Sequence, residues 1–124
     1  MDPDDVDQEL AVFPKIVADA KSWFPGETDV MILGDLNADC GYFDEDQQIE
    51  LRDPVKYKWL ITNQMDTNVA GTSCAYDRII VTSEMNAKFT GEAGVLRFDE
   101  IYELDWEPKK LSDHYPVYGV FEID

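Results

Sequence analysis

Three short stretches of the sequence carry side chains that could do chemistry. They are GDLN at 34–37, AYDRI at 75–79 and LSDHYP at 111–116. Together they hold three aspartates, an asparagine and the only histidine of the chain, namely Asp35, Asn37, Asp77, Asp113 and His114. Carboxylate and amide oxygens suit Mg²⁺, which keeps several waters and takes further ligands from substrate phosphate. An imidazole beside such an ion could move a proton in a hydrolytic reaction.

Each stretch taken singly has an ordinary structural explanation. GD is typical of a turn, DR of a surface pair, and a lone histidine of a satisfied structural side chain. The three stretches, however, each lie at the start or the end of an expected strand. Strand ends on one edge of a sheet converge in space, and α/β proteins place ligands there. Taken together, the stretches therefore indicate a hard-cation site with an acid–base group beside it.

A helix should precede the first of these stretches. Apolar residues recur at intervals of three and four over residues 4–24, which is the pattern of an amphipathic helix. They are Val6, Leu10, Phe13, Val17, Ala20 and Phe24. Pro14 lies inside this pattern, and a proline in a helix interior costs about 3 kcal/mol. We therefore expect a kink or two helices, the second beginning near Pro14.

Several short apolar runs predict the remaining elements. Strands are expected at 29–33, 76–83 and 114–123, and 93–99 is expected as a short strand or extended segment. Residues 57–62 could form a helix or a strand, and 98–104 is a short helix candidate with Asp99 as its N-cap. No repeat or linker divides the chain. These elements predict one layered domain of the α/β or α+β class.

The composition limits the function classes. The chain has 10 basic and 27 acidic residues and a net charge of −17, which argues against binding nucleic acid through Lys and Arg. Cations held by carboxylates would nevertheless present positive charge locally. No apolar run approaches the roughly 18–20 residues that span a bilayer, so a membrane protein is not expected. No signal peptide is visible. Two cysteines could be free thiols in a reducing compartment or a disulfide in an exported chain.

The motifs GDLNADC, CAYDRI and SDHYPV together resemble the DNase I family of the endonuclease/exonuclease/phosphatase superfamily. The likeness covers most of the chain, in order and in approximate spacing. The resemblance implies half of a four-layer α/β/β/α sandwich, with two packed sheets and helices outside. The chain is similar to the C-terminal half only. We therefore expect residues 1–124 to form a single partial domain, with one mixed sheet covered by helices on one face.

The resemblance also implies a role for each residue of the three stretches. Asp35 would activate the attacking water and help bind metal, and Asn37 would contact the scissile phosphate or the metal. Asp77 would hold His114 in its working tautomer. Asp113 would be a metal ligand. His114 would stabilise the transition state or transfer a proton.

Further positions match the family outside the central motifs. Asp66 and Asn68 fall where the family has a calcium loop, although family members have Thr at the second position. Thr72 matches a phosphate-contacting hydroxyl, and Tyr76 a phosphate-binding position. The implied cofactors are Mg²⁺ and Ca²⁺. In the secreted deoxyribonucleases the two cysteines of these motifs form a disulfide, so the resemblance implies that Cys40 and Cys74 are bonded and that the protein is secreted or otherwise extracytoplasmic.

The family's first half has no counterpart in this chain. In the family it supplies a metal-binding Glu, a second catalytic His and the Arg and Tyr that read the minor groove. A sheet lacking its twin would expose an apolar face, and leaving about 500 Å² uncovered forgoes about 12 kcal/mol. We therefore expect the missing N-terminal half-domain or a homodimer partner to cover that face.

The resemblance predicts metal-dependent phosphodiester hydrolysis by a DNase I-like endonuclease that acts on DNA through the complete domain. The isolated half is expected to be inactive or nearly so. Two alternatives remain open from the sequence. One is a phosphatase or phosphodiesterase of the same superfamily that acts on lipid or inositol phosphates. The other is a non-catalytic interaction fragment.

Overall fold

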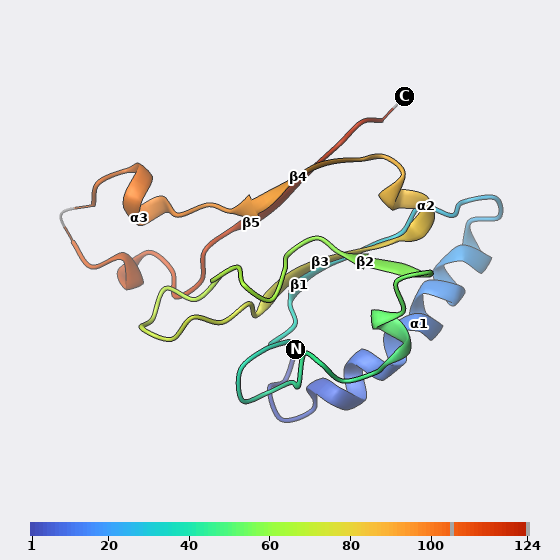
Figure 1. Ribbon diagram of the computed structural model, residues 1–124, viewed down its shortest axis with the longest axis horizontal. Coiled ribbons are helices and arrows are strands. Elements are labelled where there is room, and N and C mark those ends of the chain that lie inside the picture. The colour runs from blue at the N-terminus through green and yellow to red at the C-terminus, as the bar shows by residue number, and fades with distance from the viewer. Residues whose placement is uncertain (105, 124) are drawn as a thin grey trace.

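The computed structural model describes residues 1–104 and 106–123 and contains two antiparallel sheets (Figure 1). The first has three strands in the order β1-β3-β2, and the second has two in the order β4-β5. Their bounds are Met31–Asp35 for β1, Tyr57–Trp59 for β2, Asp77–Thr82 for β3, Phe89–Val95 for β4 and Val117–Phe121 for β5. Both pairs in the first sheet are antiparallel, with β3 in the centre.

Helices occupy the connections. The long helix α1 (Val6–Trp23) precedes β1, and Figure 1 shows it running along one side of the three-stranded sheet. The short helices are α2, α3 and two 3₁₀ turns, with bounds Ser83–Asn86, Phe98–Ile101, Glu50–Arg52 and Pro108–Lys110. None of the helices within the described residues is long and apolar enough to cross a membrane.

The central strand β3 contributes to two cores because its side chains alternate between the faces of the sheet. Ile80 packs with the buried Val6, Leu10 and Val17 of α1. Ile79 and Val81 face the other way and pack with residues of β4 and β5, among them Phe89, Val117 and Phe121. The α+β class expected from the sequence is confirmed.

Some details of the architecture differ from the expectation. The single mixed sheet is wrong, because the described strands form two sheets and every pair is antiparallel. The second face of the larger sheet is partly covered by the two-stranded sheet of β4 and β5 rather than left bare. Leu33 on β1 nevertheless remains 64% exposed on that face.

The helix expectations are corrected at one proline, Pro14, and at one cap, Asp99. One continuous helix contains Pro14, where we expected a kink or a second helix. The buried contacts of Leu10 and Val17 on either side outweigh the lost backbone bond. Asp99 is not the N-cap of α3, since Arg97 occupies that position and the Asp99 carboxylate instead accepts a hydrogen bond from the Tyr115 hydroxyl at 2.7 Å. The undecided segment 57–62 begins as strand β2.

Candidate active site

The strand register places two of the candidate carboxylates side by side. In the antiparallel pair of β1 and β3, Asp35 is the direct partner of Asp77. Directly opposed residues on adjacent strands have Cβ atoms about 4.5–5.5 Å apart. The end of β1 and the start of β3 therefore form one edge of the sheet that carries both side chains.

A loop from the middle of the chain brings the histidine to the same edge. Asn68 and His114 form an isolated antiparallel bridge. The Val69 N–H donates to the Asp113 carbonyl at 2.9 Å, and the Tyr115 N–H donates to the Thr67 carbonyl at 2.8 Å. These backbone bonds fix the segment of Asp113 and His114 before β5 begins, so the position of the imidazole does not depend on its own side-chain contacts alone.

His114 lies among three carboxylates. Its Nδ1 is 2.7 Å from Asp77 Oδ2, and its Nε2 is 3.7 Å from Asp35 Oδ2 and 4.0 Å from Asp113 Oδ1. Burial alone would lower the pKa of His114, but the hydrogen bond and charge of Asp77, together with the charges of Asp35 and Asp113, raise the pKa above its ordinary value. With Nδ1 held by Asp77, the ring presents Nε2 to the remaining carboxylates.

Asp77 is the least exposed member of this group, with its side chain 14% exposed. Burial raises the pKa of Asp77, and the hydrogen bond from His114 opposes that rise. The hydroxyl of Thr67, which is fully buried, accepts the backbone N–H groups of Tyr76 at 3.1 Å and Asp77 at 3.2 Å. The carboxylate that orients the imidazole is thus itself anchored through its backbone.

The donor set of this edge fits a divalent cation. One ligand atom each from Asp35, Asp77 and His114 lie within 4.8 Å of one another. Asp77 Oδ2 already accepts from the imidazole, so the carboxylates of Asp35 and Asp113, both near Nε2, are the better oxygen ligands. The Asp113 side chain is 71% exposed and the Asp35 side chain 43% exposed, which leaves room for the waters that Mg²⁺ retains.

Asn37 and Tyr76 lie beside this group without joining it. The Asn37 N–H donates to Asp35 Oδ1 at 3.1 Å, while its side-chain Nδ2 donates to the Met1 carbonyl at 2.6 Å. The Tyr76 ring centroid is 6.2 Å from that of His114. Both residues therefore flank the candidate site, and the Asn37 amide is turned to the N-terminal segment.

The predicted calcium loop is an ordered turn. Asp66 Oδ1 accepts the N–H groups of Asn68 at 3.0 Å and Cys74 at 3.2 Å. The Asn68 side chain donates to the Thr72 carbonyl at 3.0 Å. Hydrogen bonds within the loop thus engage the two residues expected as calcium ligands. Thr72 itself is exposed at the surface, as a phosphate-contacting residue would need to be.

The predicted disulfide between Cys40 and Cys74 is confirmed, with Cα atoms 5.9 Å apart. It joins the loop after β1 to the segment before β3. Two further buried residues of the same region were missed by sequence reasoning, namely Asp39, which lies inside the quoted NADC motif, and Arg78, which lies inside CAYDRI. Arg78 donates to the carbonyls of Ile61 at 2.7 Å and Ala38 at 2.8 Å.

A cavity of about 300 Å³ opens next to the imidazole. Its walls are partly apolar, since Leu33, Pro116 and Val117 line it together with Asp77 and His114. The group of carboxylates and imidazole therefore borders open space, which a substrate group could enter.

Comparison with known proteins gives relatives of one kind. No family model matches the chain. Deoxyribonuclease-1 of Bos taurus is 42% identical over 94 residues, which cover 72% of this chain and 33% of that protein. Deoxyribonuclease-1 of Oryctolagus cuniculus is 37% identical over 121 residues, covering 93% and 42%.

Deoxyribonuclease gamma of Mus musculus is 36% identical over 116 residues, covering 89% of this chain and 37% of that protein. The chain therefore spans between 33% and 42% of the length of these three relatives. The matched stretches cover between 72% and 93% of this chain. The chain belongs to the deoxyribonuclease I-like family.

Proposed function

We propose that this chain provides one half of the catalytic site of a metal-dependent deoxyribonuclease. The observation that carries the proposal is the pairing of His114 Nδ1 with Asp77 Oδ2 at 2.7 Å while Nε2 faces Asp35. The relatives bear the name deoxyribonuclease, which gives DNA as the substrate of those proteins. Phosphodiester hydrolysis of DNA is the reaction that this group of side chains suits best.

The proposed roles follow from the geometry. Asp77 holds His114 with Nε2 directed outward, where it can donate to or accept from a reacting phosphate. Asp35 and Asp113 would hold Mg²⁺, which would stabilise the negative charge that develops on the phosphate oxygens. Asn37 and Tyr76 flank this position, and together with Thr72 they would contact the phosphate backbone, as the resemblance to the family implies. Asp66 and Asn68 form a loop that Ca²⁺ stabilises.

The complete domain requires more chain than is present here. The chain spans 42% or less of the three relatives compared above. In the proposal, residues 1–124 form the C-terminal half of a domain, and an N-terminal half or a second copy covers the exposed Leu33 beside the site. Catalytic groups that act as a unit lose most of their effect when one is removed. The isolated chain is therefore expected to have little or no activity.

The disulfide supports an extracytoplasmic location, because such bonds persist in oxidising compartments and are rare elsewhere. The proposal accordingly places the protein outside the cytoplasm, where millimolar Ca²⁺ is available to the Asp66 loop. A phosphatase acting on lipid or inositol phosphates would use a similar metal site. The relatives favour DNA over that substrate.

A chimera tests the proposal directly. In the chimera, this chain replaces the 121 matched residues of rabbit deoxyribonuclease-1. Plasmid nicking by the chimera and by the isolated chain is measured in the presence of Mg²⁺ and Ca²⁺. We expect nicking by the chimera, loss of nicking in its His114→Ala variant, and almost none by the isolated chain. A folded chimera that does not nick, or that nicks equally well without His114, contradicts the proposal. Hydrolysis of inositol phosphates without nicking would assign the site to the phosphatases.

A further inference from the structure

The loop that carries Asn37 has a backbone that must be held in place. Asn37 has a φ of 48° and Cys40 a φ of 53°, and neither is glycine. The left-handed region costs non-glycine residues of order 1–3 kcal/mol, and such residues persist only where their surroundings fix them. Two of them within four positions show that contacts with the rest of the molecule determine the shape of residues 37–40.

Asp39 makes the contacts that could do this. The residue is only 9% exposed. Its Oδ1 accepts the N–H of Cys40 and its Oδ2 accepts the N–H of Ala75, each at 2.7 Å. Hydrogen bonds to an ionised carboxylate are about twice as strong as neutral ones. One carboxylate therefore connects the backbone of the loop to the backbone just before β3, across 36 positions of the sequence.

The disulfide alone does not supply this connection. The disulfide joins the side chains of Cys40 and Cys74, whereas the Asp39 carboxylate accepts hydrogen bonds from the backbone N–H groups of Cys40 and Ala75. A buried carboxylate is costly unless it is paired and hydrogen-bonded. Burial raises the pKa of Asp39, but the hydrogen bonds of Ala75, Cys40 and Glu45, together with the charge of the buried Arg78, bring this pKa below its ordinary value.

We propose that Asp39 is a positioning residue, which fixes the loop of Asn37 on the start of β3 and so sets the place of Asn37 relative to Asp35 and Asp77. Neither of its oxygens is directed at the imidazole, since both accept backbone N–H groups. The consequence for catalysis rests on the proposed function. The attachment of the loop does not, because it is a property of the folded chain without metal or DNA.

The experiment compares Asp39→Ala with Thr82→Val in the oxidised, metal-free chain. Thr82 is the matched control, because its buried hydroxyl bonds the backbone of Val30 and Thr28 at the opposite end of β3. The readouts are hydrogen exchange of the Leu36 N–H, which donates to the Tyr76 carbonyl at 3.0 Å, and the NMR signals of the Asn37 side-chain amide. Mass spectrometry verifies that the disulfide is intact.

We expect Asp39→Ala to speed exchange of the Leu36 N–H by about 10- to 100-fold, the range for losing charge-assisted hydrogen bonds, and to shift the Asn37 amide signals. Thr82→Val should leave the Asn37 amide signals unchanged, and it should not speed exchange of the Leu36 N–H more than that of other amides. Unchanged Leu36 protection in Asp39→Ala, or equal acceleration of all amides in both variants, overturns the proposal. Asp39→Asn keeps one acceptor oxygen and gives the same comparison with a smaller effect if Asp39→Ala does not fold. Since no DNA or metal is present, an inactive chimera would leave this result unaffected.

Discussion

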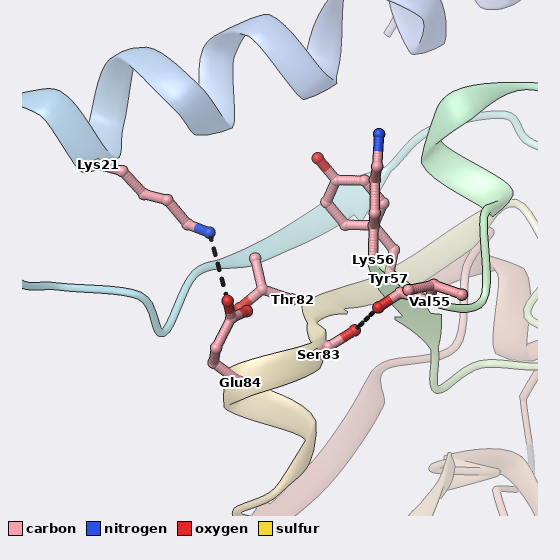
Figure 2. Close-up of a pocket in the computed structure, with 7 residues that line it drawn as sticks. All are labelled: Lys21, Val55, Lys56, Tyr57, Thr82, Ser83 and Glu84. Atoms are coloured by element: carbon pink, nitrogen blue, oxygen red, sulfur yellow. Dashed lines mark hydrogen bonds and ion pairs between the residues drawn. The ribbon is translucent and has the colours of Figure 1, made fainter.

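The two ends of the β1–β3 pair have opposite electrostatic character. At one end Asp35, Asp77 and Asp113 surround the imidazole of His114. Within the described residues, no Lys or Arg forms an ion pair with these carboxylates. At the other end, β3 finishes at Thr82 and leads into α2, beside a cavity of about 200 Å³ (Figure 2).

Each charged residue that lines this second cavity has a partner of opposite charge. Figure 2 shows Lys21 of α1 extending toward Glu84, and the two lie 4.0 Å apart. Lys56 pairs with Glu50 at 2.9 Å. The hydroxyls are also occupied, since Thr82 donates to the Thr28 carbonyl at 2.8 Å and Ser83 donates to the carbonyl of Val55. The contacts of this cavity connect α1, β2 and α2.

This difference in charge pairing distinguishes a candidate functional site from a structural cluster within the same small sheet. Paired opposite charges and satisfied hydroxyls stabilise contacts between elements, and they leave nothing for a ligand to complete. Like charges gathered around one titratable ring destabilise the fold unless a cation or a proton joins them. Only the Asp77 end has that character, although the opposite end has a well-formed cavity.

The largest effect should come from the covalent link that only the site end has. Replacing Cys40 and Cys74 by Ser should lower the free energy of unfolding by about 3–4 kcal/mol, the chain-entropy value for a loop of this length. Urea unfolding of the oxidised chain and the double variant measures the difference. Equal midpoints, or two free thiols in the denatured unreduced chain, would contradict the expectation.

A matched pair of threonines sharpens the comparison between the ends. Thr67 and Thr82 are both buried, and both hydroxyls accept backbone N–H groups from other segments. Replacing either by Val should cost about 1–3 kcal/mol, because buried N–H donors lose their acceptor. Only Thr67→Val should alter the ¹⁵N signals of the imidazole. Since the chain has a single histidine, the imidazole ¹⁵N signals need no assignment. A shift of the same size in Thr82→Val would contradict the expected difference between the two ends.

The interaction between Asp77 and His114 should make the stability of the fold depend on pH. Asp77 raises the pKa of His114 above the ordinary 6.5. A group whose pKa is higher in the folded state contributes stability that is fully present below its unfolded pKa and is lost as pH rises through its folded pKa. Metal-free chain should therefore lose stability above about pH 6.5, and Asp77→Asn should lose much of this dependence. An unchanged profile in the variant would show that another group is responsible.

The smallest effect is expected at the opposite end. Glu84→Gln removes the partner of Lys21, and an exposed ion pair contributes about 0–1 kcal/mol. The free energy of unfolding should fall by less than about 0.5 kcal/mol, and the signals of His114 should not move. Urea unfolding at low and high salt checks this. A loss above 1.4 kcal/mol, which is about tenfold in the folding equilibrium, would contradict the expectation that this ion pair contributes little to stability.

The sequence allowed much of the sheet and the convergence of the site to be predicted. The runs at 29–33 and 76–83 correspond to β1 and β3, because apolar β-branched residues between turn signals are a strong strand pattern. Asp35, Asp77 and His114 meet as expected from their places at strand ends. Local patterns suffice here because each of these side chains lies at the end of a strand, and the pairing of the strands then brings Asp35 and Asp77 together.

Other features depend on contacts between distant segments, which local patterns do not contain. The roles of Thr67 and Asp39 arise from side-chain bonds to backbone groups 9 and 36 positions away. Strand β4 begins at Phe89, earlier than expected, since its pairing with β5 overrides the weak strand preference of its two glycines. The continuity of α1 through Pro14 likewise depends on the core that it packs against.

The antiparallel register of β1 and β3 also affects how this chain can change in length. The connections that enter β1 and leave β3 both lie at the Thr82 end, away from the paired Asp35 and Asp77. Extra residues there would lengthen surface turns without moving either carboxylate, and exposed turns tolerate insertions well. A fluorescent domain or an affinity tag could therefore be inserted in the exposed residues 24–28 between α1 and β1, while the opposite edge of the sheet stayed the same.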